Sequence, residues 1–146
     1  MKDSNDIITR AAIEADLPEI QQLYSIWGHA FAYLLNDQTF VAEVNGRIVG
    51  AVRLAFEESS FVVRSLFVVK KYRMLGVAKV LLETVETELG ISEAYCLPFP
   101  EQENLFSGIG FNPVVGLSVP DFLLRRRESL REANQEVTIM KRSFGV

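Results

Sequence analysis

The feature that most constrains the fold is a change of pattern near the middle of the chain. Residues 61–69 are almost wholly apolar after Arg64 and Ser65, as in a β-strand that is buried on both faces. A short basic turn follows, and residues 77–89 then place their apolar side chains along one stripe of a helix. A buried strand that leads into an amphipathic helix is typical of layered proteins, in which helices cover a sheet.

The flanking sequence continues this alternation of strands and helices. We expect strands over residues 7–12, 39–44, 47–56, 94–99, 112–119 and 136–144, and helices over residues 17–27, 29–35, 101–107 and 121–134. Asn45 and Gly46 predict a tight hairpin turn, and Asp16 with Glu19 predicts a capping box at a helix N-terminus. The order of elements predicts an α/β or α+β sandwich with a mixed sheet, in a single domain over residues 1–146.

Charge and cysteine content limit the classes of function. The net charge of −4 gives no support for general nucleic-acid binding, so an anionic ligand needs a local positive patch. Cys96 is the only cysteine, so we expect no internal disulfide and a reducing, cytoplasmic compartment. Residues 1–6 lack the apolar core of a signal peptide, and no apolar run is long enough to span a membrane. No group of histidines and cysteines has the spacing of a metal site.

The basic turn supplies a local positive patch. Lys70, Lys71, Arg73 and Lys79 lie around Gly76, at the start of the predicted helix. The first N–H groups of a helix lack internal partners and carry partial positive charge, so a phosphate fits there. The pattern of Arg73, Gly76 and an alanine is weak by itself, because it arises by chance in roughly one chain in ten. A solvated turn explains it as well as a phosphate site does.

The same segment resembles the cofactor loop of the GNAT superfamily of acyl-CoA-dependent N-acyltransferases. That loop begins with Gln or Arg, has Gly three residues later, and has Gly or Ala two residues after that. Arg73, Gly76 and Ala78 occupy these three positions. The resemblance extends in consistent order over about residues 7–119. It includes the opening segment 8–18, the hairpin 40–50, and Gly110-Phe111 with Pro113-Val114.

The resemblance implies a GNAT-like mixed, mostly antiparallel central sheet with helices on both faces. In this family the strand before the loop and the next parallel strand splay apart, and the pantetheine arm of CoA lies in the gap. The resemblance therefore implies that Phe67 and Val68 offer backbone groups to pantetheine, and that the Val68 N–H stabilises the oxyanion of the thioester. The implied residues of the pyrophosphate loop are Arg73, Met74, Leu75, Gly76, Val77, Ala78 and Lys79.

The implied activity is transfer of an acetyl group from acetyl-CoA to a primary amine of a small molecule. The amine attacks directly in a ternary complex, with acetyl-CoA as cosubstrate and no metal. A weak likeness to amino-acid N-acetyltransferases makes an amino acid one candidate acceptor. The alternative function is a non-catalytic acyl-CoA sensor or interaction module. A homodimer and a monomer are both left open.

The acid–base residues of the reaction are not marked clearly. Many family members carry a tyrosine four residues before the Gly110-Phe111 pair, and it is proposed to protonate the departing thiolate. Here that position is Phe106, which has no proton to donate, and the adjacent Ser107 is a candidate replacement. Glu57, at the end of the third strand, is a candidate general base. A solvated strand end is the favoured explanation of Glu57, by about two to one.

Three other features have simpler explanations than catalysis. Cys96 is typical of a small core residue. His29, the only histidine, is more typical of a structural role. The arginines of the predicted helix 121–134 favour a solvated helix face over recognition of an acidic substrate. These arginines are Arg125, Arg126, Arg127 and Arg131.

Overall fold

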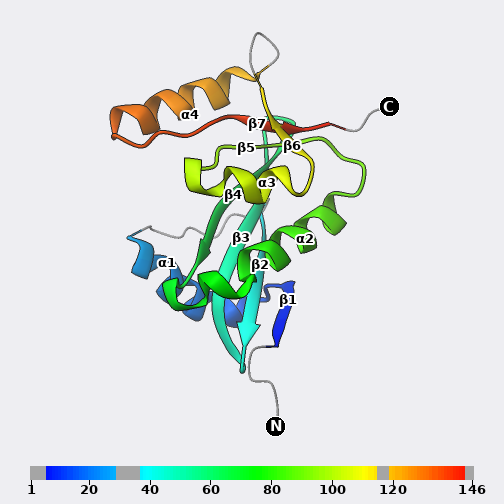
Figure 1. Cartoon of the computed structure of the whole chain (residues 1–146), viewed down its shortest axis with the longest axis vertical. Helices are drawn as coiled ribbons and strands as arrows, with labels where there is room; N and C mark the ends of the chain where they lie inside the picture. The colour runs from blue at the N-terminus through cyan, green and yellow to red at the C-terminus, as the bar shows by residue number, and fades with distance from the viewer. Residues whose placement is uncertain (1–5, 29–36, 115–118, 144–146) are drawn as a thin grey trace.

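The computed structural model describes residues 6–28, 37–114 and 119–143. Within these residues, seven strands form one sheet in the order β1-β2-β3-β4-β5-β7-β6 (Figure 1). Neighbouring strands are antiparallel except for β4 and β5, which are parallel. The prediction of a mixed, mostly antiparallel sheet is therefore confirmed.

The elements follow the alternation seen in the sequence. The strands are β1 (Ile7–Ala11), β2 (Gln38–Val44), β3 (Arg47–Glu57), β4 (Ser60–Val68), β5 (Ala94–Cys96), β6 (Phe111–Pro113) and β7 (Met140–Arg142). The α-helices are α1 (Leu17–Trp27), α2 (Val77–Leu89), α3 (Glu103–Ser107) and α4 (Asp121–Glu132). Short 3-10 helices are η1 (Glu14–Asp16), η2 (Lys70–Leu75) and η3 (Pro100–Gln102).

The sheet buries both of its faces under helices. Phe40 and Ala42 of β2 join the core beneath α2, whereas Val41 between them packs with α1 on the other face. This alternation is the two-residue period of a strand. A third apolar cluster joins α4 to the β5 and β7 side of the sheet, through Phe122 and Leu123 among others. Helices on both faces, as expected, are confirmed (Figure 1).

Gly50 allows α2 to approach the sheet closely. A Cβ atom at this position would lie 3.1 Å from a methyl of Val68 and 3.2 Å from methyls of Val77 and Leu81. Any side chain here would therefore push the first turn of α2 away from β4. The close approach of the α2 N-terminus to the end of β4 thus depends on Gly50 of β3.

The predicted capping box at the start of α1 is wrong. Asp16 makes no cap hydrogen bond to α1, because its carboxylate accepts the Ile13 N–H and two hydrogen bonds from Arg10. The Arg10 guanidinium holds the pKa of the Asp16 carboxyl below its usual range. Glu19 instead accepts the Ile48 N–H at 2.8 Å, which fastens α1 to the start of β3.

Three of the predicted strands are shorter in the structure. Among the described residues, the segments expected over 94–99, 112–119 and 136–144 form strands at Ala94–Cys96, Phe111–Pro113 and Met140–Arg142 alone, while residues 115–118 and 144 lie outside the described part. The neighbouring apolar residues Leu97, Val114 and Ile139 pack in the cluster that contains Phe122 and Leu123 of α4. The predicted helix 29–35 and His29 lie outside the described residues. No helix in the described part of the chain is both long and apolar enough to cross a membrane.

Candidate functional site

The parallel strands β4 and β5 separate after a short paired stretch. Phe61, Val62 and Val63 pair with Ala94, Tyr95 and Cys96, and the pairing ends at Val63. Strand β5 cannot continue normally, because Pro98 and Pro100 follow it and proline has no N–H for a ladder. The second cause lies in β4 itself.

A bulge at Ser65 turns β4 away from the path of β5. Arg64 lies opposite Arg53 and Phe67 lies opposite Ala51, so the β4 strand has one more residue between these pairs than β3 has. Ser65 adopts a φ of 58°, which is uncommon for a residue with a side chain. The buried Tyr24 hydroxyl donates to the Ser65 carbonyl at 2.6 Å and so holds the bulge in place.

Beyond the bulge, alternate peptide groups of β4 face the gap. The Val69 N–H donates to the Val49 carbonyl, so residue 69 faces β3. Because peptide directions alternate along a strand, Val68 and Leu66 face the gap. Their carbonyls accept from Arg73 at 2.8 Å and from Gln102 at 3.4 Å. By the same alternation the backbone of Phe67 faces β3, opposite Ala51.

A cavity of about 380 Å³ occupies the gap beside the end of β4. We call it the cofactor-side cavity. Its lining includes six of the residues selected from the sequence: Phe67, Val68, Arg73, Gly76, Ala78 and Lys79. Met74, Leu75 and Val77 are not part of the lining. Met74 is 93% exposed, whereas the side chain of Val77, the first residue of α2, is fully buried in the core.

The N-terminus of α2 opens onto the cofactor-side cavity. Gly76 has a φ of 83° and ends η2 directly before α2 begins. No heavy atom outside its chain neighbours lies within 4 Å of the place where a Cβ would stand. The first helical hydrogen bond runs from the Val80 N–H to the Gly76 carbonyl, so the N–H groups of residues 77–79 have no acceptor within the helix.

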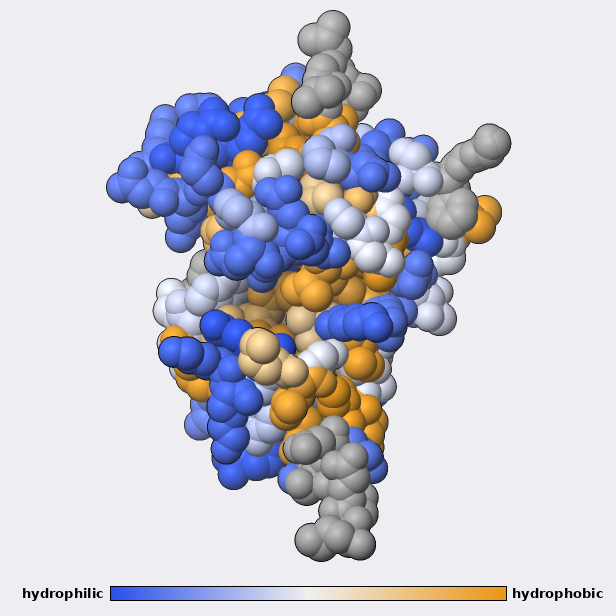
Figure 2. Space-filling model, viewed as in Figure 1, coloured by the Kyte–Doolittle hydropathy of each residue, from blue (hydrophilic) through white to orange (hydrophobic). Residues whose placement is uncertain are grey.

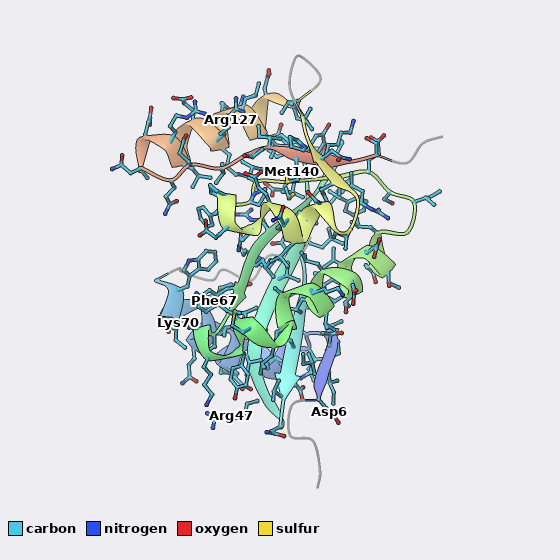
Figure 3. All side chains as sticks on the ribbon, in the orientation of Figure 1. Asp6, Arg47, Phe67, Lys70, Arg127 and Met140 are labelled. Carbon is cyan, nitrogen blue, oxygen red and sulfur yellow. The ribbon has the colours of Figure 1, made fainter. Side chains whose placement is uncertain are left out.

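Arg73 connects this helix start to the strand edge. Its Nε donates to the Val68 carbonyl, and its guanidinium lies over the Phe67 ring, 5.4 Å from the centroid. The Phe67 ring is also stacked on the ring of Trp27 of α1, with centroids 5.2 Å apart. Figure 3 shows Phe67 beside the start of η2, near Lys70. One cationic and two aromatic side chains thus form a fixed wall.

A second cavity, of about 270 Å³, adjoins the first. Trp27, Leu66, Phe99 and Gln102 line both cavities. We call the second the acceptor-side cavity, and it extends between β4, the segment after β5, and α4. Figure 2 shows the molecule hollowed across its middle, with apolar side chains in the recess.

Glu57 contacts Arg64 and Arg126 of the acceptor-side cavity but is not itself part of the lining. Its carboxylate accepts hydrogen bonds from Arg126 at 2.5 and 3.3 Å and from Arg64 at 3.1 Å. Partial burial alone would raise the pKa of Glu57, but the two guanidinium groups outweigh burial and hold that pKa below its usual value. A carboxylate with a lowered pKa and two cationic partners is a poor proton acceptor.

The other candidate acid–base residues differ in their access to the cavities. Phe106 is buried, lines the acceptor-side cavity and packs edge-on against Phe111, with centroids 5.6 Å apart. Ser107 is exposed at the end of α3 and lines neither cavity. Cys96 is fully buried, and burial raises the pKa of its thiol well above the usual value. Among the described residues, no group of three His, Cys, Asp or Glu side chains is placed to hold a metal ion.

Sequence reasoning missed several lining residues of the two cavities. Phe99 carried a usable signal, since it lies between Pro98 and Pro100 and its backbone is therefore held extended. Trp27 and Gln102 were assigned only to helices. The basic side chains Arg64 and Arg126 were not placed in a site, because they come from elements 62 residues apart in sequence.

Comparison with known proteins gives a consistent family assignment. Residues 36–113 match the model of the acetyltransferase (GNAT) domain. This segment includes the bulged strand, η2, α2 and the segment after β5. A search of curated proteins found no match.

Solved structures with the same fold are acetyltransferases of different specificities. The ribosomal-protein-S18-alanine N-acetyltransferase of Escherichia coli superposes with a TM-score of 0.71 at 14% identity, over 97% of each chain. The Neisseria gonorrhoeae N-acetylglutamate synthase, complexed with coenzyme A and N-acetyl-glutamate, gives 0.69 at 18% identity, over 97% of this chain and 36% of that one. The Paenibacillus lautus diaminobutyrate acetyltransferase, in complex with its substrate and coenzyme A, gives 0.67 at 17% identity, over 94% and 93%.

Proposed function

Because this chain belongs to the GNAT family of acetyltransferases, we propose that it transfers the acetyl group of acetyl-CoA to a primary amine of a small molecule. The observation that carries the proposal is the splayed edge of β4 beside the N-terminus of α2. An open strand edge suits the amide groups of pantetheine, and a helix N-terminus suits a pyrophosphate.

The cofactor residues of this proposal extend from Leu66 to Lys79. Leu66 and Val68 offer the gap-facing backbone groups, and Phe67 contributes its ring. The amides of residues 77–79 bind the pyrophosphate, with Gly76 leaving space for it. Arg73 and Lys79 add positive charge at the cavity wall, and Met74, Leu75 and Val77 complete the loop between them.

The proposed reaction is a direct attack of the amine on the thioester. The amine nitrogen forms a bond to the carbonyl carbon, the carbon–sulfur bond then breaks, and the amine loses a proton while the thiolate gains one. The Val68 N–H faces the gap and supplies a hydrogen bond to the oxyanion. Loss of one such donor typically costs about 100-fold or more in rate.

Proton transfer in this proposal relies on solvent. Phe106 stands where many family members carry a tyrosine, and Ser107 lines neither cavity. A thiol is only moderately basic, with an ordinary pKa of about 8.5, so a thiolate leaves without a strong acid near neutral pH. Glu57 is better suited to hold its two arginines than to accept the proton of the amine.

The setting of the reaction follows from the same residues. A fully buried Cys96 and the absence of any second cysteine in the sequence favour a reducing, cytoplasmic compartment. We treat residues 1–146 as one catalytic unit, either monomeric or dimeric. Two of the structural neighbours are associated by name with amino-acid substrates or products, which favours an amino acid among small amines.

The test is a screen of primary amines with acetyl-CoA, read by release of free thiol. We expect amine-dependent release by the wild-type protein, together with a higher melting temperature in the presence of CoA. Stabilisation by CoA without turnover of any amine would favour an acyl-CoA sensor. If millimolar CoA neither stabilises the protein nor supports turnover, the proposal is wrong.

A further inference from the structure

The charged side chains that line the acceptor-side cavity are all cationic. They are Arg64 of β4 and Arg126 of α4, and the remaining lining side chains among the described residues are apolar or neutral. The neutral polar groups nearby include Gln102 and Gln135, both of which can donate hydrogen bonds. The cavity therefore offers donors and positive charge to whatever enters it.

The two arginines share one carboxylate. Arg126 and Arg64 both donate to Glu57, which leaves an excess of one positive charge in this group of three. Next to them Arg53 pairs with Asp37, so that pair adds no net charge. The exposed fractions of the Arg64 and Arg126 side chains are 36% and 30%, so both retain accessible surface, and both line the cavity.

The distance of these arginines from the reacting edge matches a small bifunctional molecule. Arg64 precedes Leu66 by two residues on β4, which separates them by at most roughly 7 Å, because the bulge at Ser65 shortens the rise. Leu66 belongs to both cavities and, among the residues that line the acceptor-side cavity, it is the nearest to Val68 along the chain. An amine placed at the reacting edge therefore leaves the rest of its molecule in the direction of Arg64 and Arg126.

We propose that the acceptor carries a carboxylate, which Arg126 and Arg64 bind, so that the substrates are small amino acids and not simple amines. This inference rests on the acetyl transfer proposed above and names the substrate class of that site. A guanidinium binds a carboxylate through two parallel hydrogen bonds. The cavity volume of about 270 Å³ suits a small molecule, and the Trp27 and Phe99 rings form its apolar wall.

Glu57 acts in this arrangement as a positioning residue. It accepts hydrogen bonds from both guanidinium groups, and it does not itself line the cavity. The substrate carboxylate joins the three charged groups as a second anion and balances the excess charge. Arg126 thereby couples α4, the last helix of the chain, to recognition of the acceptor.

The experiment compares matched ligands that differ only in the anion. The ligands are the expected reaction products, namely the common amino acids acetylated at the α-nitrogen. Each is titrated into the CoA-saturated protein, and its C-terminal carboxamide is titrated in parallel. Calorimetry gives the two dissociation constants. The free amino acids and their carboxamides are also compared as acceptors by thiol release. We expect the acid of the preferred pair to bind at least about 10-fold more tightly than its amide, because a charged hydrogen bond is lost in the amide.

Matched variants identify the arginine responsible. Arg126→Gln should reduce the preference for the acid to less than about threefold, while CoA affinity stays unchanged. Arg126→Lys retains the charge without the two-pronged geometry and should retain part of the preference. Arg131→Gln is the control, since Arg131 lies on the same helix but pairs with Glu128 and Glu136 outside the cavity. It should leave the preference intact.

The outcomes separate this inference from the proposed activity. A preference for acids without any turnover supports the carboxylate site and contradicts acetyl transfer. Turnover with equal use of acids and amides supports acetyl transfer and overturns the carboxylate site. Loss of preference in Arg131→Gln to the same extent as in Arg126→Gln also overturns it. Acetylation of acidic peptides in place of free amino acids would overturn the assignment to small molecules.

Discussion

The cofactor-side and acceptor-side cavities adjoin each other but are built in different ways. The cofactor side comes largely from one continuous segment, residues 66–79, and much of what it offers is backbone: strand-edge peptides and the first amides of α2. The acceptor side gathers side chains from α1, β4, the segment after β5, α3, α4 and the segment before β7. Among the described residues, its charged lining side chains are Arg64 and Arg126.

This difference explains why the sequence can vary more freely around the acceptor-side cavity than the backbone contacts of the cofactor-side cavity can. Backbone groups are the same in every sequence, so a strand edge and a helix start can offer the same contacts in proteins whose sequences differ widely. Side chains from separate segments change independently, so the acceptor can differ among proteins with one fold. The structural neighbours act on a ribosomal protein in one case and on diaminobutyric acid in another, which fits this division.

The largest expected effect is on the cofactor side, at Gly76. Gly76→Glu places a carboxylate where the pyrophosphate binds, and like charges in contact cost several kcal/mol, so CoA affinity should fall by roughly 100-fold or more. Gly46→Glu is the matched control, because Gly46 has a φ of 78° and equally open surroundings in the β2–β3 turn. Both variants carry the same backbone strain, so calorimetry with CoA isolates the effect of location. Equal affinities in the two variants would contradict the loop assignment.

The next effect is on the acceptor side, at Glu57. Glu57→Gln removes the anion that holds Arg64 and Arg126, so the KM for the acceptor should rise by about 10-fold while the KM for acetyl-CoA stays unchanged. The lowered pKa of Glu57 adds a pH signature. Its ion pairs form fully above the ordinary pKa of about 4.3 and are lost as pH falls through the lower folded-state value. If Glu57 is instead the base, kcat falls strongly and the pH–rate profile shifts.

The two halves also differ in how far the sequence predicted them. The strand–turn–helix over residues 61–89 was predicted correctly, because its periodicity and its glycine are local signals. The bulge at Ser65 was not predicted, since it depends on Tyr24 and on the β3 register, and no local pattern marks it. The contact between Arg126 and Glu57 joins residues 69 positions apart, so the sequence favoured a solvated basic helix face over recognition of an acidic substrate.

A smaller effect should link the core to the cofactor side, at Gly50. Gly50→Ala inserts a methyl group 3.1–3.2 Å from side chains of β4 and α2, so the free energy of unfolding should fall by about 1–3 kcal/mol. Because the first turn of α2 must move outward, CoA affinity should also fall, by about fivefold. Urea unfolding and CoA titration measure the two quantities. A destabilised variant with unchanged CoA affinity would show that the helix position is not critical.

A still smaller effect is expected at Lys79. Its side chain is 74% exposed and lies 4.0 Å from Glu83, so its attraction for a phosphate is screened by salt. Lys79→Ala should weaken CoA binding by about threefold at low salt and by less at high salt. CoA titrations at two salt concentrations test this. An affinity that is equally sensitive to salt in both proteins would assign the salt dependence to other groups, such as Arg73 or Lys71.

The smallest effects are expected at the residues beside the missing tyrosine. Ser107→Ala should change turnover by less than about threefold, because Ser107 is exposed and lines neither cavity. Phe106→Tyr should leave turnover similar or raise it, since a hydroxyl at the cavity wall can protonate the thiolate. Initial rates of thiol release measure both. A large loss of turnover in Ser107→Ala, with CoA binding preserved, would make Ser107 the general acid.

The most direct test of the central claim is a titration of ¹⁵N-labelled protein with CoA, followed by backbone amide NMR. If the cosubstrate binds through the strand edge and the helix start, the amides of Leu66, Val68 and residues 77–79 should show the largest shifts. The amides of α4 on the acceptor side should change little. Shifts centred on α4, or no shifts at millimolar CoA, would contradict the account.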